Sequence, residues 1–150
     1  MASNLSNSAI NGAGEGDRVL FLYIPPMAVL DDLSARVRNG IIVCLGNRDA
    51  VYDARKAGVH LPNTMFIAAD LDEIPWQEGF FNWVLECGAP SEAAVYREIV
   101  RVLAPDGRLL LGSLDREAFQ AYGLVSDGDL LRKPEAPPKP APPPNLPILQ

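Results

Sequence analysis

Two side chains with reactive groups, Glu86 and Cys87, follow a short apolar run in the middle of the chain. A carboxylate can act as a general base and a thiolate as a nucleophile. α/β enzymes place such groups at the carboxyl ends of their strands. The single histidine, His60, is distant in the sequence and gives Cys87 no adjacent base. A strand-end acid beside a buried thiol is therefore favoured over a catalytic pair, and no catalytic residue is nominated.

The other candidate metal and interaction residues are few. Cys44 and Cys87 form no CxxC pair, so the sequence predicts neither a zinc site nor a disulfide framework. The acidic loop over residues 72–78 is expected to be a solvated face. The aromatic residues nearby are expected in or near the core, with Trp76 as an alternative exposed anchor for a partner.

Short apolar runs alternate along the chain with segments of helical periodicity. Each run is apolar on consecutive residues, which is typical of a parallel strand covered on both faces. This alternation predicts an α/β fold with a doubly wound, mostly parallel sheet. The expected strands cover residues 19–24, 41–45, 65–68, 81–85 and 108–111, with a final strand over residues 124–132.

Capping residues predict where the helices lie between these strands. Asn47 is expected to cap a helix that ends at Gly58. Ser91 is expected to cap another helix, which stops at Pro105. Two further helices are expected over residues 27–37 and 115–122.

Both ends of the chain differ in composition from its centre. Residues 1–16 are rich in Ser, Asn and Gly, which predicts a flexible arm before an α/β domain over residues 17–132. Eight of the fourteen prolines lie from Pro134 to Pro147, which predicts a polyproline II tail over residues 133–150. This tail could be a linker, dock on an SH3-like groove of a partner, or add an edge strand to a sheet.

The charge and hydropathy of the chain exclude some classes of partner. A net charge of -6 argues against a sequence-independent grip on nucleic acid or anionic lipid. No segment approaches the ~18 apolar residues of a membrane span, and the N-terminus does not resemble a signal peptide. We therefore expect a cytoplasmic protein with neither a nucleic-acid nor a membrane partner.

Three segments carry motifs: residues 16–20 (GDRVL), 69–85 (ADLDEIPWQEGFFNWVL) and 97–111 (REIVRVLAPDGRLLL). In this order they resemble the class I S-adenosylmethionine-dependent methyltransferases, most closely the small, type 11-like enzymes of ubiquinone biosynthesis. The third motif is the most specific. The resemblance covers roughly residues 16–132 and implies a Rossmann-like sheet, truncated at the N-terminus and followed by the proline-rich tail.

The resemblance implies a cofactor site at four positions. Asp70 would accept a hydrogen bond from the adenine amino group and Leu71 would lie beside the ring, although a helix or turn cap at the strand end is favoured for Asp70. Asn47 stands where the family has the acid that holds the ribose hydroxyls, and it can make only one neutral hydrogen bond there. Glu86, at the end of the fourth strand, completes the expected cofactor-binding set.

The loop after the first strand departs from the family pattern. The family has a glycine-rich loop whose bare backbone approaches the methionine part of the cofactor, whereas this chain has YIPPM at residues 23–27. Pro25 and Pro26 supply no N–H, and side chains fill the space of the missing glycines. The glycines of residues 12–16 precede the strand, so they do not replace this loop.

These departures favour one function and leave a second open. A micromolar site has roughly -8 kcal/mol of binding free energy, and each lost polar contact removes on the order of 1–3 kcal/mol. We therefore expect a module that binds no cofactor usefully and acts through a protein partner or self-association, for which the tail is a candidate. The alternative is a small active methyltransferase that uses S-adenosylmethionine with a remodelled loop. A different nucleotide-binding domain is disfavoured because no GxxxxGK or correctly placed GxGxxG occurs.

Overall fold

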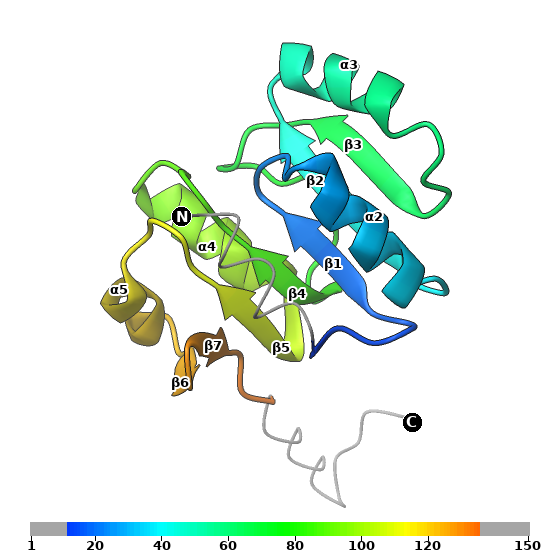
Figure 1. Cartoon of the computed structure of the whole chain (residues 1–150). Coiled ribbons are helices and arrows are strands. Elements are labelled where there is room, and N and C mark those ends of the chain that lie inside the picture. The colour runs from blue at the N-terminus through cyan, green and yellow to red at the C-terminus, as the bar shows by residue number, and fades with distance from the viewer. Residues whose placement is uncertain (1–11, 136–150) are drawn as a thin grey trace, which may run out of the picture.

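Seven strands form one mixed sheet in the computed structural model, which describes residues 12–135 (Figure 1). The strand order is β3-β2-β1-β4-β5-β7-β6. Strands β1 to β5 are parallel, and β7 runs antiparallel to β5 and β6. The predicted α/β, mostly parallel fold is confirmed. The strands are β1 (Arg18–Phe21), β2 (Ile41–Gly46), β3 (Thr64–Ala68), β4 (Phe81–Leu85), β5 (Leu103–Leu110), β6 (Val125–Asp127) and β7 (Leu130–Arg132).

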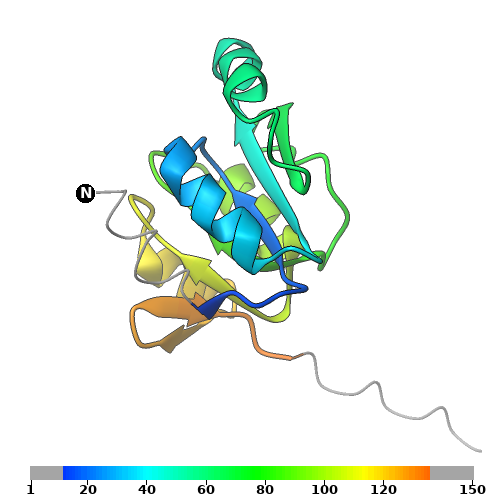
Figure 2. The same ribbon diagram turned by 45° about the vertical axis from the view of Figure 1, so that its right-hand side comes forward.

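Helices cover both faces of this sheet (Figures 1 and 2). Helices α2 (Met27–Arg36) and α3 (Arg48–Ala57) pack on one face, and α4 (Ala93–Val102) and α5 (Arg116–Ala121) pack on the other. Along β1, Val19 and Phe21 belong to the first core, whereas Leu20 and the following Leu22 belong to the second. Burial on both faces therefore explains why the strand is apolar on consecutive residues.

One predicted helix cap is confirmed and the other is wrong. The Asn47 side chain caps α3 and accepts the backbone N–H of Ala50 at 2.8 Å. Ser91 does not cap α4, because Glu92 is the N-cap residue and makes no side-chain cap bond. The Ser91 hydroxyl instead lies 3.3 Å from the hydroxyl of Tyr96.

Strand β5 begins at Leu103, earlier than the predicted start at Arg108. Its register against β4 shifts: Phe81 pairs with Leu103, but Trp83, two residues later, pairs with Arg108, five residues later. The extra residues of β5 form a bulge. Within the bulge Asp106 has a positive φ of 66°.

The last predicted strand, over residues 124–132, is a hairpin of two strands. Residues Leu130 and Asp127 pair across it, and Gly128 in the turn has a φ of 62°. The two-residue loop is Gly128-Asp129, and glycine readily adopts the positive φ that the first position of such a hairpin loop requires. The first strand is also shorter than predicted and ends at Phe21.

Part of the segment expected as an arm packs on the domain. Ala13 is 7% exposed and belongs to the first core. Glu15 accepts hydrogen bonds from the side chains of Arg38, at 3.2 Å, and Asn39. Residues 1–11 and 136–150, with the rest of the arm and most of the tail, lie outside the described residues. The domain boundaries therefore stay predictions.

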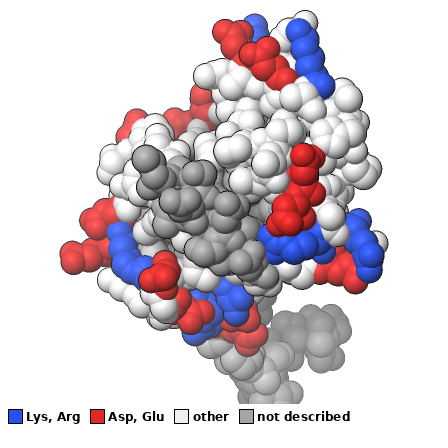
Figure 3. All heavy atoms as spheres, viewed as in Figure 1, with Lys and Arg blue, Asp and Glu red and all other residues white. Residues whose placement is uncertain are grey.

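Acidic and basic groups lie intermixed on the described part of the face seen in Figure 3. Within residues 12–135, no helix is long and apolar enough to cross a membrane. The same residues hold no group of three His, Cys, Asp or Glu side chains arranged for a metal ion.

Candidate functional site

The candidate site is the region at the carboxyl ends of β1 and β4, which we name the crevice after its position in the fold. These strands are neighbours, and the helices that follow them, α2 and α4, pack on opposite faces (Figure 1). Ligands of open α/β sheets bind at such a point, where the two connections diverge. The residues that follow β1 and β4 therefore decide what the crevice can hold.

On the β1 side, side chains pack at the end of the strand. Tyr23, Ile24 and Met27 are partly buried and pack against the first core, and Pro25 is buried. The Ile24 side chain lies against Gly46 at the end of β2, because a Cβ at position 46 would be 3.0 Å from Ile24 Cδ1. An isoleucine thus occupies the space beside the backbone of β2.

On the β4 side, Glu86 is 2% exposed and joins two loops. Its Oε1 accepts the N–H groups of Gly112, Ser113 and Leu114 at 3.0–3.1 Å. Its Oε2 accepts the Ser113 hydroxyl at 2.6 Å and the N–H of Ala89 at 3.1 Å. Burial alone would raise the pKa of Glu86, but the hydrogen bonds from Ser113, Leu114 and Ala89 outweigh it and lower the pKa. The carboxylate is an ionised anchor whose acceptor capacity is used inside the protein.

Neither thiol is hydrogen-bonded to a basic side chain within residues 12–135. Cys44 is buried in β2, and this burial raises the pKa of its thiol, which makes it inert. Cys87 is half-buried next to Glu86. His60 lies 2.6 Å from Asp31 of α2, so it is engaged elsewhere.

Asp70 and Leu71 follow β3 and line a pocket of about 180 Å³ together with Pro90 and Val95. This volume is below the roughly 300–1,000 Å³ of typical ligand sites. Asp70 is exposed, and its backbone carbonyl, not its carboxylate, accepts the N–H of Glu73 and closes a turn. Leu71 is half-buried against the second core.

The four predicted cofactor-binding residues thus all follow the carboxyl ends of parallel strands, but their environments differ. Asn47 is exposed, and its Oδ1 is used by the cap of α3. Glu86 is buried and bonds toward the loop after β5. Asp70 alone presents an exposed carboxylate, with Leu71 beside it.

Two side chains of α4 hold the loop between β3 and β4 by hydrogen bonds that the sequence did not indicate. Arg101 of α4 donates to the carbonyls of Ile74, at 2.8 Å, and Trp76, at 2.7 Å, and pairs with Glu98 at 2.7 Å. Glu98 accepts the N–H of Ile74 at 2.8 Å. The hydrogen bond from Arg101 lowers the pKa of Glu98. Acid and base three residues apart on a helix were the available signal.

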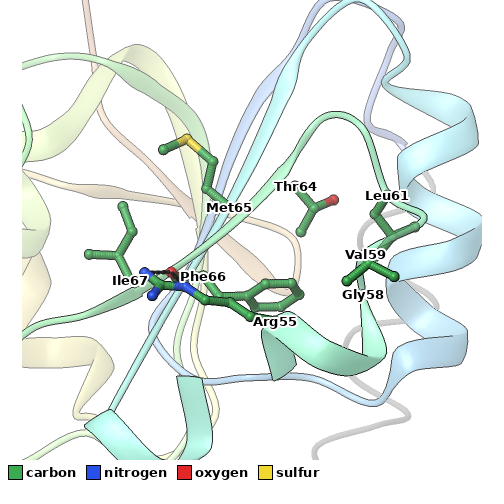
Figure 4. Close-up of a pocket in the computed structure, with 8 residues that line it drawn as sticks. All are labelled: Arg55, Gly58, Val59, Leu61, Thr64, Met65, Phe66 and Ile67. Carbon is green, nitrogen blue, oxygen red and sulfur yellow. Dashed lines mark hydrogen bonds between the residues drawn. The ribbon is translucent and has the colours of Figure 1, made fainter. Parts of the chain in front are cut away.

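A pocket of about 360 Å³ lies at the edge strand β3, away from the crevice (Figure 4). Arg55 of α3 donates two hydrogen bonds to the Phe66 carbonyl, at 3.0 and 2.8 Å. This pairing satisfies an outward carbonyl of the edge strand, which would otherwise be free to pair with another chain. The Arg55 guanidinium in this pocket therefore protects the edge strand β3 from pairing with another chain.

No protein-family model and no curated protein matches the sequence, but solved structures do match the fold. A SAM-dependent methyltransferase from Aquifex aeolicus has a TM-score of 0.64 and 18% identity, over 71% of this chain and 62% of that chain. The YcgJ protein from Bacillus subtilis has a TM-score of 0.64 and 20% identity, over 72% and 49%. The [4+2]-cyclase SpnF has a TM-score of 0.67 and 16% identity, over 81% and 56%.

The chain has the α/β fold of the class I S-adenosylmethionine-dependent methyltransferases, as its motifs predicted. It spans 49 to 62% of the length of these three structures. Identities of 16 to 20% establish the fold alone, because one fold hosts many chemistries.

Proposed function

We propose that this methyltransferase-like domain has lost productive binding of S-adenosylmethionine and acts as a protein-interaction or regulatory module. The observation that carries the proposal is the contact of Ile24 with Gly46. In the family, bare glycine backbone leaves room for the cofactor after the first strand. Here the corresponding loop brings an isoleucine against the end of β2.

The polar groups of the crevice support the same proposal. The side-chain oxygen of Asn47 accepts the hydrogen bond that caps α3, and Glu86 accepts five hydrogen bonds from the protein. Each missing polar contact weakens binding by on the order of 1–3 kcal/mol. The loss of two or more turns a micromolar affinity, roughly -8 kcal/mol, into a millimolar one.

The fold is compatible with a function other than methyl transfer. SpnF, which shares the fold at a TM-score of 0.67, is described as a [4+2]-cyclase. Function on a shared fold resides in the site, not in the scaffold. A module that acts through protein contacts needs the scaffold and its surface, and does not need the crevice.

One observation favours a second function, a small active methyltransferase for a small molecule or a protein. Asp70 and Leu71 lie side by side at the end of β3, and the Asp70 carboxylate is exposed beside a pocket. This is the arrangement an adenine contact needs. Under this alternative, Asp70→Ala abolishes cofactor binding.

Calorimetric titration with S-adenosylmethionine and with its demethylated product separates the two functions. We expect no dissociation constant tighter than about 1 mM for either ligand. Asp70→Ala is the matched control, because heat that survives in this variant does not come from the family's adenine site. A dissociation constant near or below ~10 µM that Asp70→Ala abolishes would refute the proposal.

A further inference from the structure

An aromatic pocket lies at the amino ends of the strands, opposite the crevice. Pro75, Trp76, Gln77 and Phe80 line this pocket of about 350 Å³, which we name the Trp76 pocket. The rings of Trp76 and Phe80 lie 5.8 Å apart, and the Arg18 guanidinium stacks over Phe80 at 5.0 Å. The surface therefore combines flat aromatic faces with a proline edge.

The last turn of α4 holds the Trp76 pocket in place. The Arg101 guanidinium donates to the Trp76 carbonyl at 2.7 Å, and the Arg101 carbonyl accepts the N–H of Gly79 at 2.8 Å. These bonds fix the part of the loop that joins Trp76 to Phe80. A ligand that binds there meets a preformed surface and loses little free energy to ordering.

The proline-rich tail leaves the domain beside this same turn. Lys133 Nζ donates to the carbonyls of Val100 and Leu103, both at 2.9 Å. Burial lowers the pKa of Lys133, and the charge of Glu78 partly offsets this effect. The hydrogen bond with Glu98 raises the pKa of Arg101, and the charge of Glu78 adds to this rise. The start of the tail and the rim of the Trp76 pocket are therefore close together.

We propose that the Trp76 pocket binds the chain's own proline-rich segment, residues 137–144. Six of these eight residues are proline, which favours the polyproline II conformation. Aromatic grooves bind such segments because the ligand helix is already formed. The only charged residue of the segment, Lys139, complements the carboxylate of Glu78, which follows Gln77 of the pocket in the sequence.

The length of chain outside the described residues allows this contact within one molecule. The segment begins two residues after Glu135, the last described residue. At about 3.1 Å per residue it extends to roughly 28 Å from Glu135. Lys133 donates to the carbonyl of Val100, and the Trp76 carbonyl accepts from Arg101. Val100 and Arg101 are adjacent in α4, so the tail starts near the pocket. A short tether gives a millimolar effective concentration, so a weak intrinsic affinity is enough. This contact is independent of whether the crevice binds a cofactor.

Two-dimensional 1H–15N NMR spectra of the full chain test the contact, because each tryptophan indole N–H gives a separate resonance. The test variant carries Pro140→Ala, Pro142→Ala, Pro143→Ala and Pro144→Ala, which leave every described residue unchanged. We expect the Trp76 indole resonance to move in this variant. The Trp83 indole donates to Asp17 at 3.0 Å, away from the pocket, and serves as the fixed internal reference.

Two further arms sharpen the experiment. Pro147→Ala, the matched control outside the segment, should leave the Trp76 indole at its wild-type position. A free peptide of residues 134–147, added to the fourfold variant, should return the resonance with half-saturation at or below about 1 mM. An unchanged Trp76 indole in the fourfold variant would overturn the proposal. A wild-type position that depends on protein concentration would also overturn it, because the tail would then come from a second copy.

Discussion

The two sides of the crevice between β1 and β4 are closed by different kinds of chemistry. On the β1 side, Ile24 lies on Gly46 and Pro25 is buried, so the contacts are apolar. On the β4 side, the buried Glu86 carboxylate accepts five hydrogen bonds. An isoleucine can adjust its rotamer, whereas a missing carboxylate leaves its donors unsatisfied. The β4 side is therefore the rigid one, and the β1 side is the one that substitution can reopen.

The largest effect is expected from Glu86→Ala. The variant leaves the N–H groups of Ala89, Gly112, Ser113 and Leu114 without their acceptor. We expect the free energy of unfolding to fall by about 3–5 kcal/mol, as when one partner of a buried charged pair is removed. Urea denaturation measures this change.

Glu73→Ala is the matched control for Glu86→Ala, because Glu73 is an exposed acid whose side chain lies in the loop after β3. Its unfolding free energy should stay within about 0.5 kcal/mol of wild type. A loss below about 1 kcal/mol in Glu86→Ala would contradict the anchoring role of Glu86.

Acid should expose the same difference between the two sides. The hydrogen bonds lower the pKa of Glu86 from its ordinary value of 4.5. Its carboxylate therefore stabilises the fold above pH 4.5, and this contribution is lost as the pH falls through the lower folded value. As the pH is lowered, the urea concentration at the unfolding midpoint should fall less steeply in Glu86→Gln than in wild type. Glu98, whose pKa is also lowered, leaves a residual slope in the variant. Equal slopes would count against Glu86.

Gly46→Ala probes the β1 side and should have a smaller effect. The new Cβ would lie 3.0 Å from Cδ1 and 3.2 Å from Cγ1 of Ile24, so the isoleucine must move. We expect a loss of about 1 kcal/mol in unfolding free energy. Ile24→Val removes Cδ1 and should recover part of this loss in a double-mutant cycle. Strict additivity of the two substitutions would mean that the side chains do not meet.

Asp70→Ala is expected to have the smallest effect. Asp70 is exposed and its carboxylate closes no turn, so the unfolding free energy should change by less than about 0.5 kcal/mol. A change above about 1 kcal/mol, measured by urea denaturation, would reveal a structural role for this carboxylate that the fold does not indicate.

The sequence predicted what depends on local pattern and missed what depends on distant contacts. Consecutive apolar residues located β4 at both of its ends, and Asn47 capped α3 as expected. The role of Glu86 could not be predicted, because four of the five groups that donate to it lie 26 to 28 residues further along the chain. The final hairpin was a missed local signal, since the pair Gly128-Asp129 forms its two-residue loop.

The proposed closure of the crevice is tested most directly by crystals soaked with the demethylated product of S-adenosylmethionine at millimolar concentration. We predict that Ile24 stays against Gly46 and that no nucleoside density appears between β1 and β4. Clear density for the bound nucleoside, with its methionyl end against Ile24 and Met27, would contradict the loss of cofactor binding.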